Sequence, residues 1–379
     1  MKTTTKAILL LLISTMLLSI TLPTYAETPM LISSLETQPI TKTFSLETAI
    51  KYAQDNSTTQ AINKTKLEAA KLSLDEQKVA QYKALDKGAY VFEGVKTRNG
   101  YYVKLSQMGL LLTEKGIIQT DSIIRSQTEN VYFTYQNALD KKEICDNILQ
   151  YAKDNLKTAQ LKSTLGLTSD IDLMYANNAV LKATIDKANA ERALDYSRMD
   201  FNKALNLPLD TKIELTDKIA CVKYDEVTVA EKAELAKANR MEAIQAKEQL
   251  ELDKKLLEVT GKFYMPNTYG YKKAQFNAMT SEDTYKSTLN TVQLSVYKAY
   301  NDMVSAYASL EWLDAQITLQ QKVYDIAKIK YEQGISANSE VTDALNKLLD
   351  AKLNKAQAML GYNLAKTKFT NSYNIGLGN

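Results

Sequence analysis

One stretch of the chain occurs twice, with the second copy 168 residues after the first. The copies align without a gap from Tyr132 and Tyr300 to Leu209 and Leu377, and 17 of these 78 pairs are identical. That agreement exceeds what a shared richness in Ala, Lys and Leu should produce. The chain is therefore predicted to be a tandem duplication of one supersecondary unit.

Each copy contains a glycine turn between two long segments without proline. The turn runs through residues 165–173 with Gly166 in the first copy, and through residues 331–343 with Gly334 in the second. Glycine supplies the positive φ angle that a helix C-terminus prefers. Hydroxyl or amide side chains can then cap the next helix; in the second copy these are Ser336, Asn338 and Ser339. Each copy is predicted to form a hairpin of two long helices.

The segment before the second turn shows how these helices pack. Apolar or small side chains recur there every seven residues, with partners three residues further on, and only Gln320 interrupts them. The seam consists of Val296, Ala299, Met303, Ala306, Leu310, Leu313, Ile317, Tyr324 and Ala327. Such a seam is typical of coiled-coil packing, and a helix from Asp283 to Gln333 would be roughly 75 Å long. On the seam alone, a long structural coiled coil is the favoured interpretation.

The rest of the chain divides around the two copies. Residues 1–26 have the basic start, apolar centre and small-residue end of a secretory signal, so we expect the protein to be exported. Without the two lysines of this signal the charges nearly balance, which argues against a nucleic-acid partner. The expected parts after the signal are an extended leader at 27–42, a first repeat at 43–210 with an insert at 88–116, a connector at 211–227 that starts as a strand, and a second repeat at 228–379 with an insert at 262–282.

These features together resemble the TolC family of outer-membrane efflux proteins. The resemblance rests on the export signal, an opening helix at 44–56 and the duplicated Gly-apolar-hydroxyl turn, and it covers about Phe44 to Leu377. It implies an all-α dominated chain, with two tandem coiled-coil hairpin repeats that form a trimeric α-barrel and at most a small β-hairpin region. It also implies a passive exit duct of an efflux or secretion system in the outer membrane, with a periplasmic adaptor protein and an inner-membrane pump as partners.

The resemblance also implies two sets of functional residues at the turns. The tips on which an adaptor hairpin would dock are Gly166, Leu167, Thr168, Gly334, Ile335 and Ser336. The residues that would close the pore mouth are Tyr331, Glu340, Asp343 and Asp172, and Ser336 stands where the family has a basic partner for the tyrosine. Simpler interpretations stay open, because glycines end helices and first-turn carboxylates stabilise helix N-termini in any protein.

Two segments distinguish this duct from its alternative, a coiled-coil structural or interaction protein of the cell envelope without a channel. The family has pairs of membrane strands in the regions that correspond to 88–112 and 262–290. In the first, alternating stretches flank an Asn99-Gly100 turn, which predicts a β-hairpin over 89–106. In the second, Pro266 interrupts any strand pattern, so membrane strands are expected to be shortened or absent.

No catalytic, cofactor or metal site is predicted. The chain has no histidine, which removes the commonest general base and metal ligand. Its two cysteines, Cys145 and Cys221, could form a disulfide after export. Cys145 lies on the helix seam of the first copy, where packing is the simpler explanation.

Overall fold

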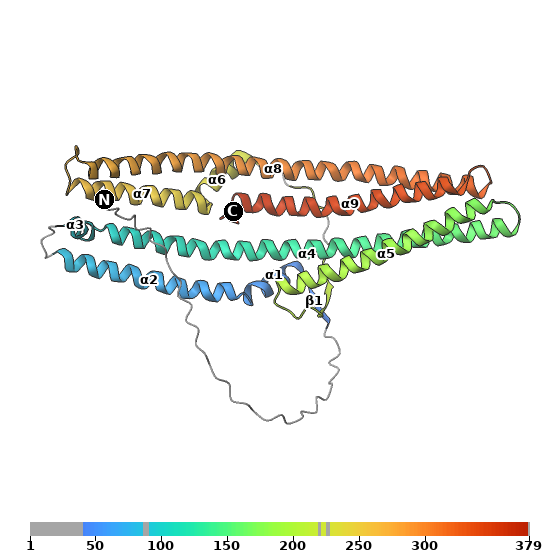
Figure 1. Cartoon of the computed structure of the whole chain (residues 1–379), viewed down its shortest axis with the longest axis horizontal. Coiled ribbons are helices and arrows are strands. Elements are labelled where there is room, and N and C mark those ends of the chain that lie inside the picture. Colours follow the sequence, from blue (N-terminus) through green and yellow to red (C-terminus); the bar gives the residue numbers. More distant parts are fainter. Residues whose placement is uncertain (1–40, 86–90, 219–220, 225–227, 378–379) are drawn as a thin grey trace, which may run out of the picture. The chain divides into compact units, whose positions relative to one another are not determined.

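The structure is a computed structural model of the chain, and it describes residues 41–85, 91–218, 221–224 and 228–377. The predicted signal and nearly all of the predicted leader lie outside these residues. Almost all of the described chain is helical (Figure 1), which confirms the all-α prediction. In this part of the chain, no helix is both long and apolar enough to cross a membrane.

Four long helices confirm the duplication. They are α4 (Tyr101–Thr164), α5 (Asp170–Ala204), α8 (Tyr269–Glu332) and α9 (Asn338–Ser372). The first helix of each copy has 64 residues and the second has 35, so that every boundary recurs after the same spacing. α4 packs along α5 as one hairpin, α8 packs along α9 as the other, and α4 joins them by packing on α9 (Figure 1).

Shorter helices precede the long hairpin of each copy. They are α1 (Leu46–Asp55) and α2 (Thr58–Leu85) in the first copy, and α6 (Val229–Asn239) and α7 (Met241–Gly261) in the second. The predicted opening helix is confirmed, and Ser45 begins it by accepting a hydrogen bond from Thr48 N–H at 3.2 Å. The corresponding segment of the second copy forms two helices, α6 and α7, which meet at Arg240, whose backbone is extended.

A two-stranded parallel sheet joins the beginning of the first copy to the connector. β1 (Thr41–Phe44) pairs with β2 (Lys212–Leu215), and the Tyr135 hydroxyl donates to Ile213 O at 3.0 Å. The Phe44 ring packs against Phe201, with 5.9 Å between the ring centroids. The sequence predicts the strand in the connector but not the partner strand, because only the fold brings residues 41–44 beside it.

Most of the predicted heptad seam is buried, and Ala306 and Ile317 are half-buried. Val296, Met303 and Leu310 are almost fully enclosed, as is Cys145 at its position on α4. Both cysteines are free thiols, and burial raises the pKa of the Cys145 thiol. The packing role of Cys145 is thus the one that the structure supports.

The β-hairpin prediction for 89–106 is wrong over its described residues. α3 (Phe92–Arg98) and the first turns of α4 occupy this segment, while residues 89 and 90 lie outside the described chain. Gly100, at a φ of 76°, reverses the chain between two helices rather than two strands, because Asn-Gly suits a helix end as well as a hairpin turn. In the second segment, residues 262–268 form a turn and residues 269–290 are helical.

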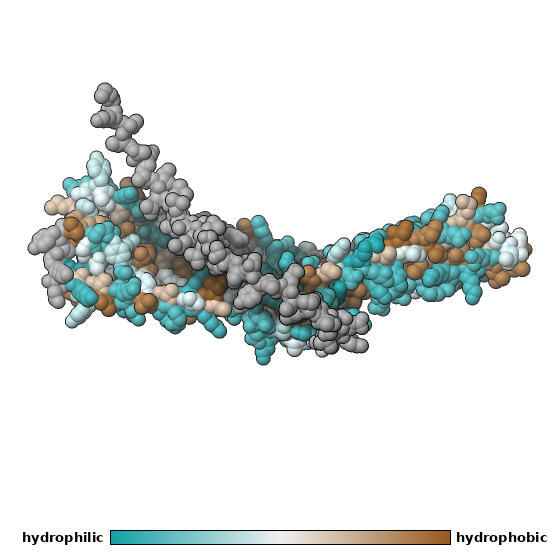
Figure 2. Space-filling view, turned by 60° about the horizontal axis from the view of Figure 1, so that its bottom comes forward, coloured by the Kyte–Doolittle hydropathy of each residue, from teal (hydrophilic) through white to brown (hydrophobic). Residues whose placement is uncertain are grey.

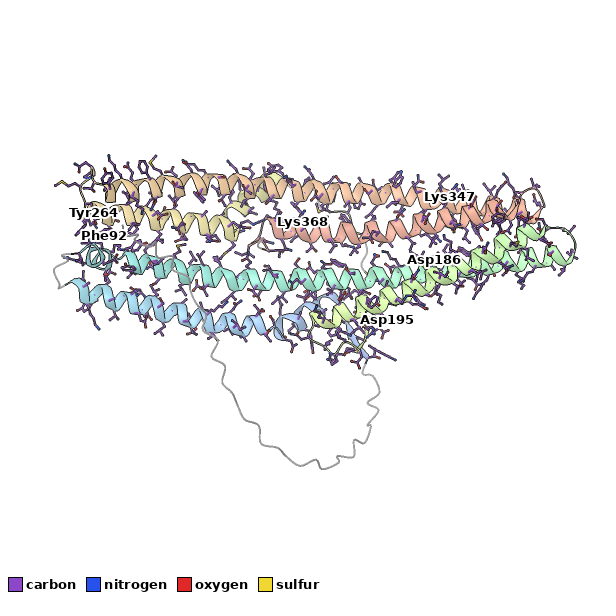
Figure 3. All side chains as sticks on the ribbon, viewed as in Figure 1. Phe92, Asp186, Asp195, Tyr264, Lys347 and Lys368 are labelled. Atoms are coloured by element: carbon purple, nitrogen blue, oxygen red, sulfur yellow. The ribbon has the colours of Figure 1, made fainter. Side chains whose placement is uncertain are left out.

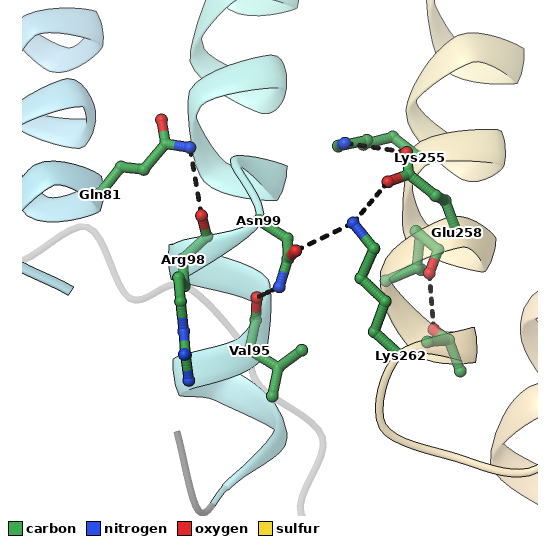
Figure 4. A network of polar contacts seen from close by, with 9 residues as sticks. Gln81, Val95, Arg98, Asn99, Lys255, Glu258 and Lys262 are labelled. Atoms are coloured by element: carbon green, nitrogen blue, oxygen red, sulfur yellow. Dashed lines mark hydrogen bonds and ion pairs between the residues drawn. The ribbon is translucent and has the colours of Figure 1, made fainter. Parts of the chain in front are cut away.

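Contacts between the two copies stabilise this end of the hairpins. Lys262 Nζ donates to Asn99 Oδ1 at 2.9 Å and pairs with Glu258 at 2.8 Å (Figure 4). The rings of Phe92 and Tyr264 lie beside one another, with 5.3 Å between their centroids (Figure 3). We call residues 91–104 and 262–273 the base. The turns at the other end of the long helices, residues 161–175 and 330–343, are the tip (Figure 1).

Candidate functional site: the tip of the paired hairpins

Both turns of the tip end their helices with a Schellman motif. In this motif the residue after the glycine donates to a carbonyl five residues earlier, and the glycine donates to one three residues earlier. The pairs are Leu167 to Lys162 at 2.8 Å, Gly166 to Ser163 at 3.0 Å, Ile335 to Lys330 at 2.9 Å and Gly334 to Tyr331 at 3.0 Å. Gly166 and Gly334 have φ angles of 69° and 75°, so each glycine is required by its turn.

The apolar residues after the glycines lie on the outside of the tip. Leu167 is 69% exposed and Ile335 is 70% exposed. Folding of a single chain buries little of these two aliphatic side chains, which occupy matched positions in the two copies. Exposed aliphatic surfaces of this kind commonly mark interaction sites. Thr168 and Ser336, the next residues, are only partly exposed.

Tyr331 is buried between the hairpins. Lys162 from the other hairpin places its Nζ 4.2 Å from the centre of the Tyr331 ring and donates a hydrogen bond to the Tyr331 carbonyl. The Thr168 and Tyr331 hydroxyl oxygens lie 3.4 Å apart. Tyr331 therefore has a basic partner, which comes from α4. The sequence analysis did not identify Lys162, and the one sequence feature that distinguishes this lysine is its recurrence as Lys330 in the second copy.

Asp172 caps the other hairpin as well as its own helix. Its Oδ1 accepts the Asn338 N–H at 2.8 Å, while its Oδ2 accepts from Ser169 Oγ at 2.9 Å and from Thr168 Oγ1 at 3.2 Å. Burial raises the pKa of Asp172, but these hydrogen bonds outweigh burial and hold the pKa below its ordinary value. The N-cap of α9 is Ala337, which has no capping side chain, so Asp172 supplies the missing acceptor.

A buried amide pair completes this contact. Asn155 Nδ2 donates to Asn338 Oδ1 at 3.1 Å, and Asn338 Nδ2 donates to Asn155 Oδ1 at 3.0 Å. Asn338 was a candidate cap from sequence, but its side chain bonds across to α4 instead. We call Lys162, Asp172 and Asn155 on the first hairpin, with Tyr331 and Asn338 on the second, the tip interlock.

Glu340 and Asp343 are not part of the tip interlock. Both carboxylates are exposed on the first turns of α9, and neither has an ion-pair or hydrogen-bond partner within the described residues. The structure thus divides the four predicted mouth residues into two pairs. Tyr331 and Asp172 join the hairpins, whereas Glu340 and Asp343 face away from that contact.

The second hairpin, with its turn and its exposed acids, is similar to a known protein family. Residues 267–371, which contain α8 and all of α9 except Ser372, match the family described as outer membrane efflux protein. These residues are therefore similar to outer membrane efflux proteins. The predicted resemblance to TolC-like efflux proteins is thereby confirmed, although no curated protein matches the chain in sequence.

Solved channels share the fold of this chain over most of its length. The channel-forming protein CusC is 13% identical, with a TM-score of 0.71 over 87% of this chain and 92% of CusC. The outer membrane protein VceC from Vibrio cholerae is 10% identical, with a TM-score of 0.70 over 88% of this chain and 97% of VceC. The open-state channel MtrE from Neisseria gonorrhoeae is 12% identical, with a TM-score of 0.66 over 88% of this chain and 89% of MtrE. At this identity the likeness establishes the fold.

Proposed function

We propose that the chain is the exit duct of a multi-component efflux or secretion system in the outer envelope of the cell. Three copies would form one helical tube, and cargo would cross it passively, with an inner-membrane pump supplying the energy. The observation that carries this proposal is the tip, where two hairpins of equal length end in the same turn and are fixed to one another. The family of residues 267–371 and the fold of solved channels support it.

The exposed side chains of the tip are the proposed docking surface for a helical hairpin of a periplasmic adaptor protein. Leu167 and Ile335 are its apolar anchors, and Gly166 and Gly334 allow close approach because nothing lies within 4 Å of a Cβ added to either. Thr168 and Ser336 border the anchors. Burying a side chain of this size contributes roughly 1.5–3 kcal/mol, so the two anchors matter far more to docking than to folding.

The exposed acids of the tip are the proposed lining of the pore mouth. Glu340 and Asp343 lie three residues apart, so they share one face of α9. In a trimer, carboxylates from three chains would gather at the narrow end and favour cations. Tyr331 and Asp172 would hold the mouth closed indirectly, by fixing the second hairpin to the first.

The decisive test replaces both anchors, as Leu167→Ser with Ile335→Ser. Because both side chains are exposed, thermal stability should change by no more than about 0.5 kcal/mol. Cells that produce normal amounts of the double variant should nevertheless lose export of the cargo. A matched control replaces exposed apolar residues at the other end of the helices, Met265 in the base and Phe276 next to it, as Met265→Ser with Phe276→Ser. This control should leave export unchanged.

Normal export by a stably folded anchor variant would contradict adaptor docking at the tip. The chain would then be better described as a coiled-coil scaffold of the cell envelope. Loss of export by the base control as well as by the anchor variant would also count against the tip, because it would show that any loss of surface apolarity disturbs function.

A further inference from the structure

A groove lies where α4, α5 and α9 meet, outside the residues of both the tip and the base. It encloses about 510 Å³, which is enough for a small organic molecule. Small and apolar side chains form much of its wall, among them Ala138 on α4, Ala190 on α5 and Leu353 on α9. On the face shown in Figure 2, hydrophobic and hydrophilic side chains are mixed along the helices that lead to the tip, so surface hydrophobicity alone marks no site there. The groove is distinguished by its polar side chains.

Asn137 brings to the groove a hydrogen-bond acceptor that has no partner. This residue lines the groove and is 7% exposed. Its Nδ2 donates to Ala356 O at 3.4 Å, which fixes the orientation of the amide. Its Oδ1 is buried and accepts no hydrogen bond from any described residue. Buried polar atoms are nearly always hydrogen-bonded, so a ligand with a donor group at this point would satisfy the amide.

Lys141, four residues further along α4, adds a positive charge without a counter-charge. Its Nζ donates to Gln357 Oε1, a neutral acceptor, at 2.8 Å. In the part of the chain that the structure describes, Lys141 has no ion-pair partner. Burial lowers the pKa of Lys141, and no nearby carboxylate opposes this effect. An anionic group in the groove would stabilise the ammonium through a charge-assisted hydrogen bond.

The acidic side chains of the groove lie closer to the tip than Lys141 does. Asp186 precedes Lys187, whose Nζ pairs with Asp146 at 2.7 Å, and this contact places Asp186 beyond Lys141 in the direction of the tip. Asp350 is exposed and comes seven residues before Gln357 on α9, which corresponds to about 10 Å along the helix. An anion bound at Lys141 therefore keeps its distance from both carboxylates.

The second copy shows that a hairpin of this kind does not require the amide and the ammonium. The counterparts of Asn137 and Lys141, 168 residues later, are Ser305 and Ser309 on α8. Both serines are exposed, and α8 packs along α9 as α4 packs along α5. Small hydroxyl side chains are thus sufficient for the helix pairing, and the chemistry of Asn137 and Lys141 is specific to the groove.

We propose that the groove binds a phenolic carboxylic acid, whose hydroxyl donates to Asn137 Oδ1 and whose carboxylate pairs with Lys141. Side chains four residues apart on a helix lie about 5–6 Å from one another, and one aromatic ring between a hydroxyl and a carboxylate spans a similar distance. A rigid ring also loses less conformational freedom on binding than an aliphatic chain. This inference goes beyond the proposed duct, because the helices of a single chain form the groove.

Calorimetric titration of the whole chain with 4-hydroxybenzoate tests the proposal. We expect saturable binding of one molecule per chain, and either Asn137→Leu or Lys141→Met should raise the dissociation constant about tenfold. Lys352→Met is the matched control, because Lys352 is another half-buried lysine whose pKa is lowered by burial, and it lies outside the groove. This control should bind 4-hydroxybenzoate as the wild type does.

Two analogues of the acid separate the two contacts. Benzoate lacks the hydroxyl, so Asn137→Leu should not change its affinity. The compound 4-hydroxybenzyl alcohol lacks the carboxylate, so Lys141→Met should not change its affinity. Lys141→Arg keeps the positive charge and should retain binding of 4-hydroxybenzoate, which distinguishes loss of the charge from a disturbed fold.

Cys145 provides a second measurement of occupancy. Its thiol is free, is 4% exposed and lines the groove. In a chain with Cys221→Ser, 4-hydroxybenzoate should slow the reaction of Cys145 with a disulfide reagent, and it should have no such effect in the Lys141→Met background.

Absence of saturable binding, or an equal loss of affinity in Lys352→Met, would overturn the proposed site and leave the proposed duct intact. Binding that depends on Asn137 but is unchanged in Lys141→Met would also overturn it, because the ligand would then be a neutral phenol. Export by the anchor variants of the tip tests the duct alone, so the two proposals can fail separately.

Discussion

The tip and the base end the same helices but have opposite surface chemistry. Residues 161–175 and 330–343 of the tip contain two basic and five acidic side chains, with exposed aliphatic residues such as Leu167. Residues 91–104 and 262–273 of the base contain six basic and one acidic, with aromatic rings in contact across the copies. The copies keep the same turn at the tip, whereas α3 is an additional helix of the first copy at the base.

This difference follows from what each end requires of its turns. At the tip, two Schellman turns of the same length allow the hairpins to meet in register. A few hydrogen bonds between the hairpins are then enough to hold the two turns together. At the base, turns of unequal length meet, and packing of Phe92 on Phe263 and Tyr264 fills the mismatch. The tip should therefore be sensitive to loss of single polar groups, and the base to loss of backbone geometry.

The largest effect is expected from Asn338→Ala at the tip. This change removes one member of a buried amide pair and leaves the Asn155 amide enclosed without a partner. An unsatisfied buried polar group costs about 1–3 kcal/mol, and this loss should appear in urea unfolding followed by circular dichroism.

The double variant Asn155→Leu with Asn338→Leu is the control for this prediction. It removes both amides together, so it should be less destabilising than either single change. Strictly additive losses would show that the two amides do not depend on each other, and the tip interlock would lose its central contact.

A smaller effect is expected from glycine replacements that compare the two ends directly. Gly100→Ala and Gly166→Ala each force a residue with a Cβ into a positive φ, which costs about 1–2 kcal/mol. At Gly166 the new Cβ meets nothing within 4 Å, whereas at Gly100 it would lie 2.9 Å from Gln81 Nε2. Gly100→Ala should therefore lower the melting temperature more than Gly166→Ala.

Gln81→Ala in the Gly100→Ala background separates the two costs. Removing the amide should recover the part of the loss that comes from the clash and leave the part that comes from φ. Equal losses for the two glycine variants, with no recovery, would mean that the base is not packed as described.

The sequence predicts the tip well because the tip is made of local signals that occur twice. A glycine, an apolar residue and a hydroxyl residue at a fixed spacing define each turn, and the structure reproduces both turns with the same hydrogen bonds. Contacts between the hairpins have no such signal. The sequence predicts Asp172 as a first-turn acid of the mouth and Asn338 as a helix cap, and it gives Lys162 no role. Only the packing of the two hairpins shows that these residues belong to one contact.

The base could not be predicted in the same way, because its local sequence is compatible with two different structures. An Asn-Gly pair between β-rich stretches indicates a hairpin, yet it equally ends a helix. Burial of Val95 and contacts of α3 with α2, α4 and α7 decide for the helix, and these contacts involve residues far apart in sequence. The parallel pairing of β1 with β2 escaped prediction for the same reason.

The smallest effect is the pH dependence of the tip interlock. The pKa of Asp172 is held below its ordinary value of 3.8 by hydrogen bonds in the folded chain, so its carboxylate stabilises the fold above that value. This stabilisation is lost as pH falls through the lower, folded-state pKa. Wild type should be more stable than Asp172→Asn at about pH 7, by up to about 1 kcal/mol. This difference in the free energy of unfolding should narrow toward about pH 3.

The exposed acid Asp343 is the matched control, since Asp343→Asn should change stability little at either pH. If the Asp172 gap were unchanged at low pH, the carboxylate would not be bonded to the N-terminus of α9, and the tip would resemble the base in depending on packing alone.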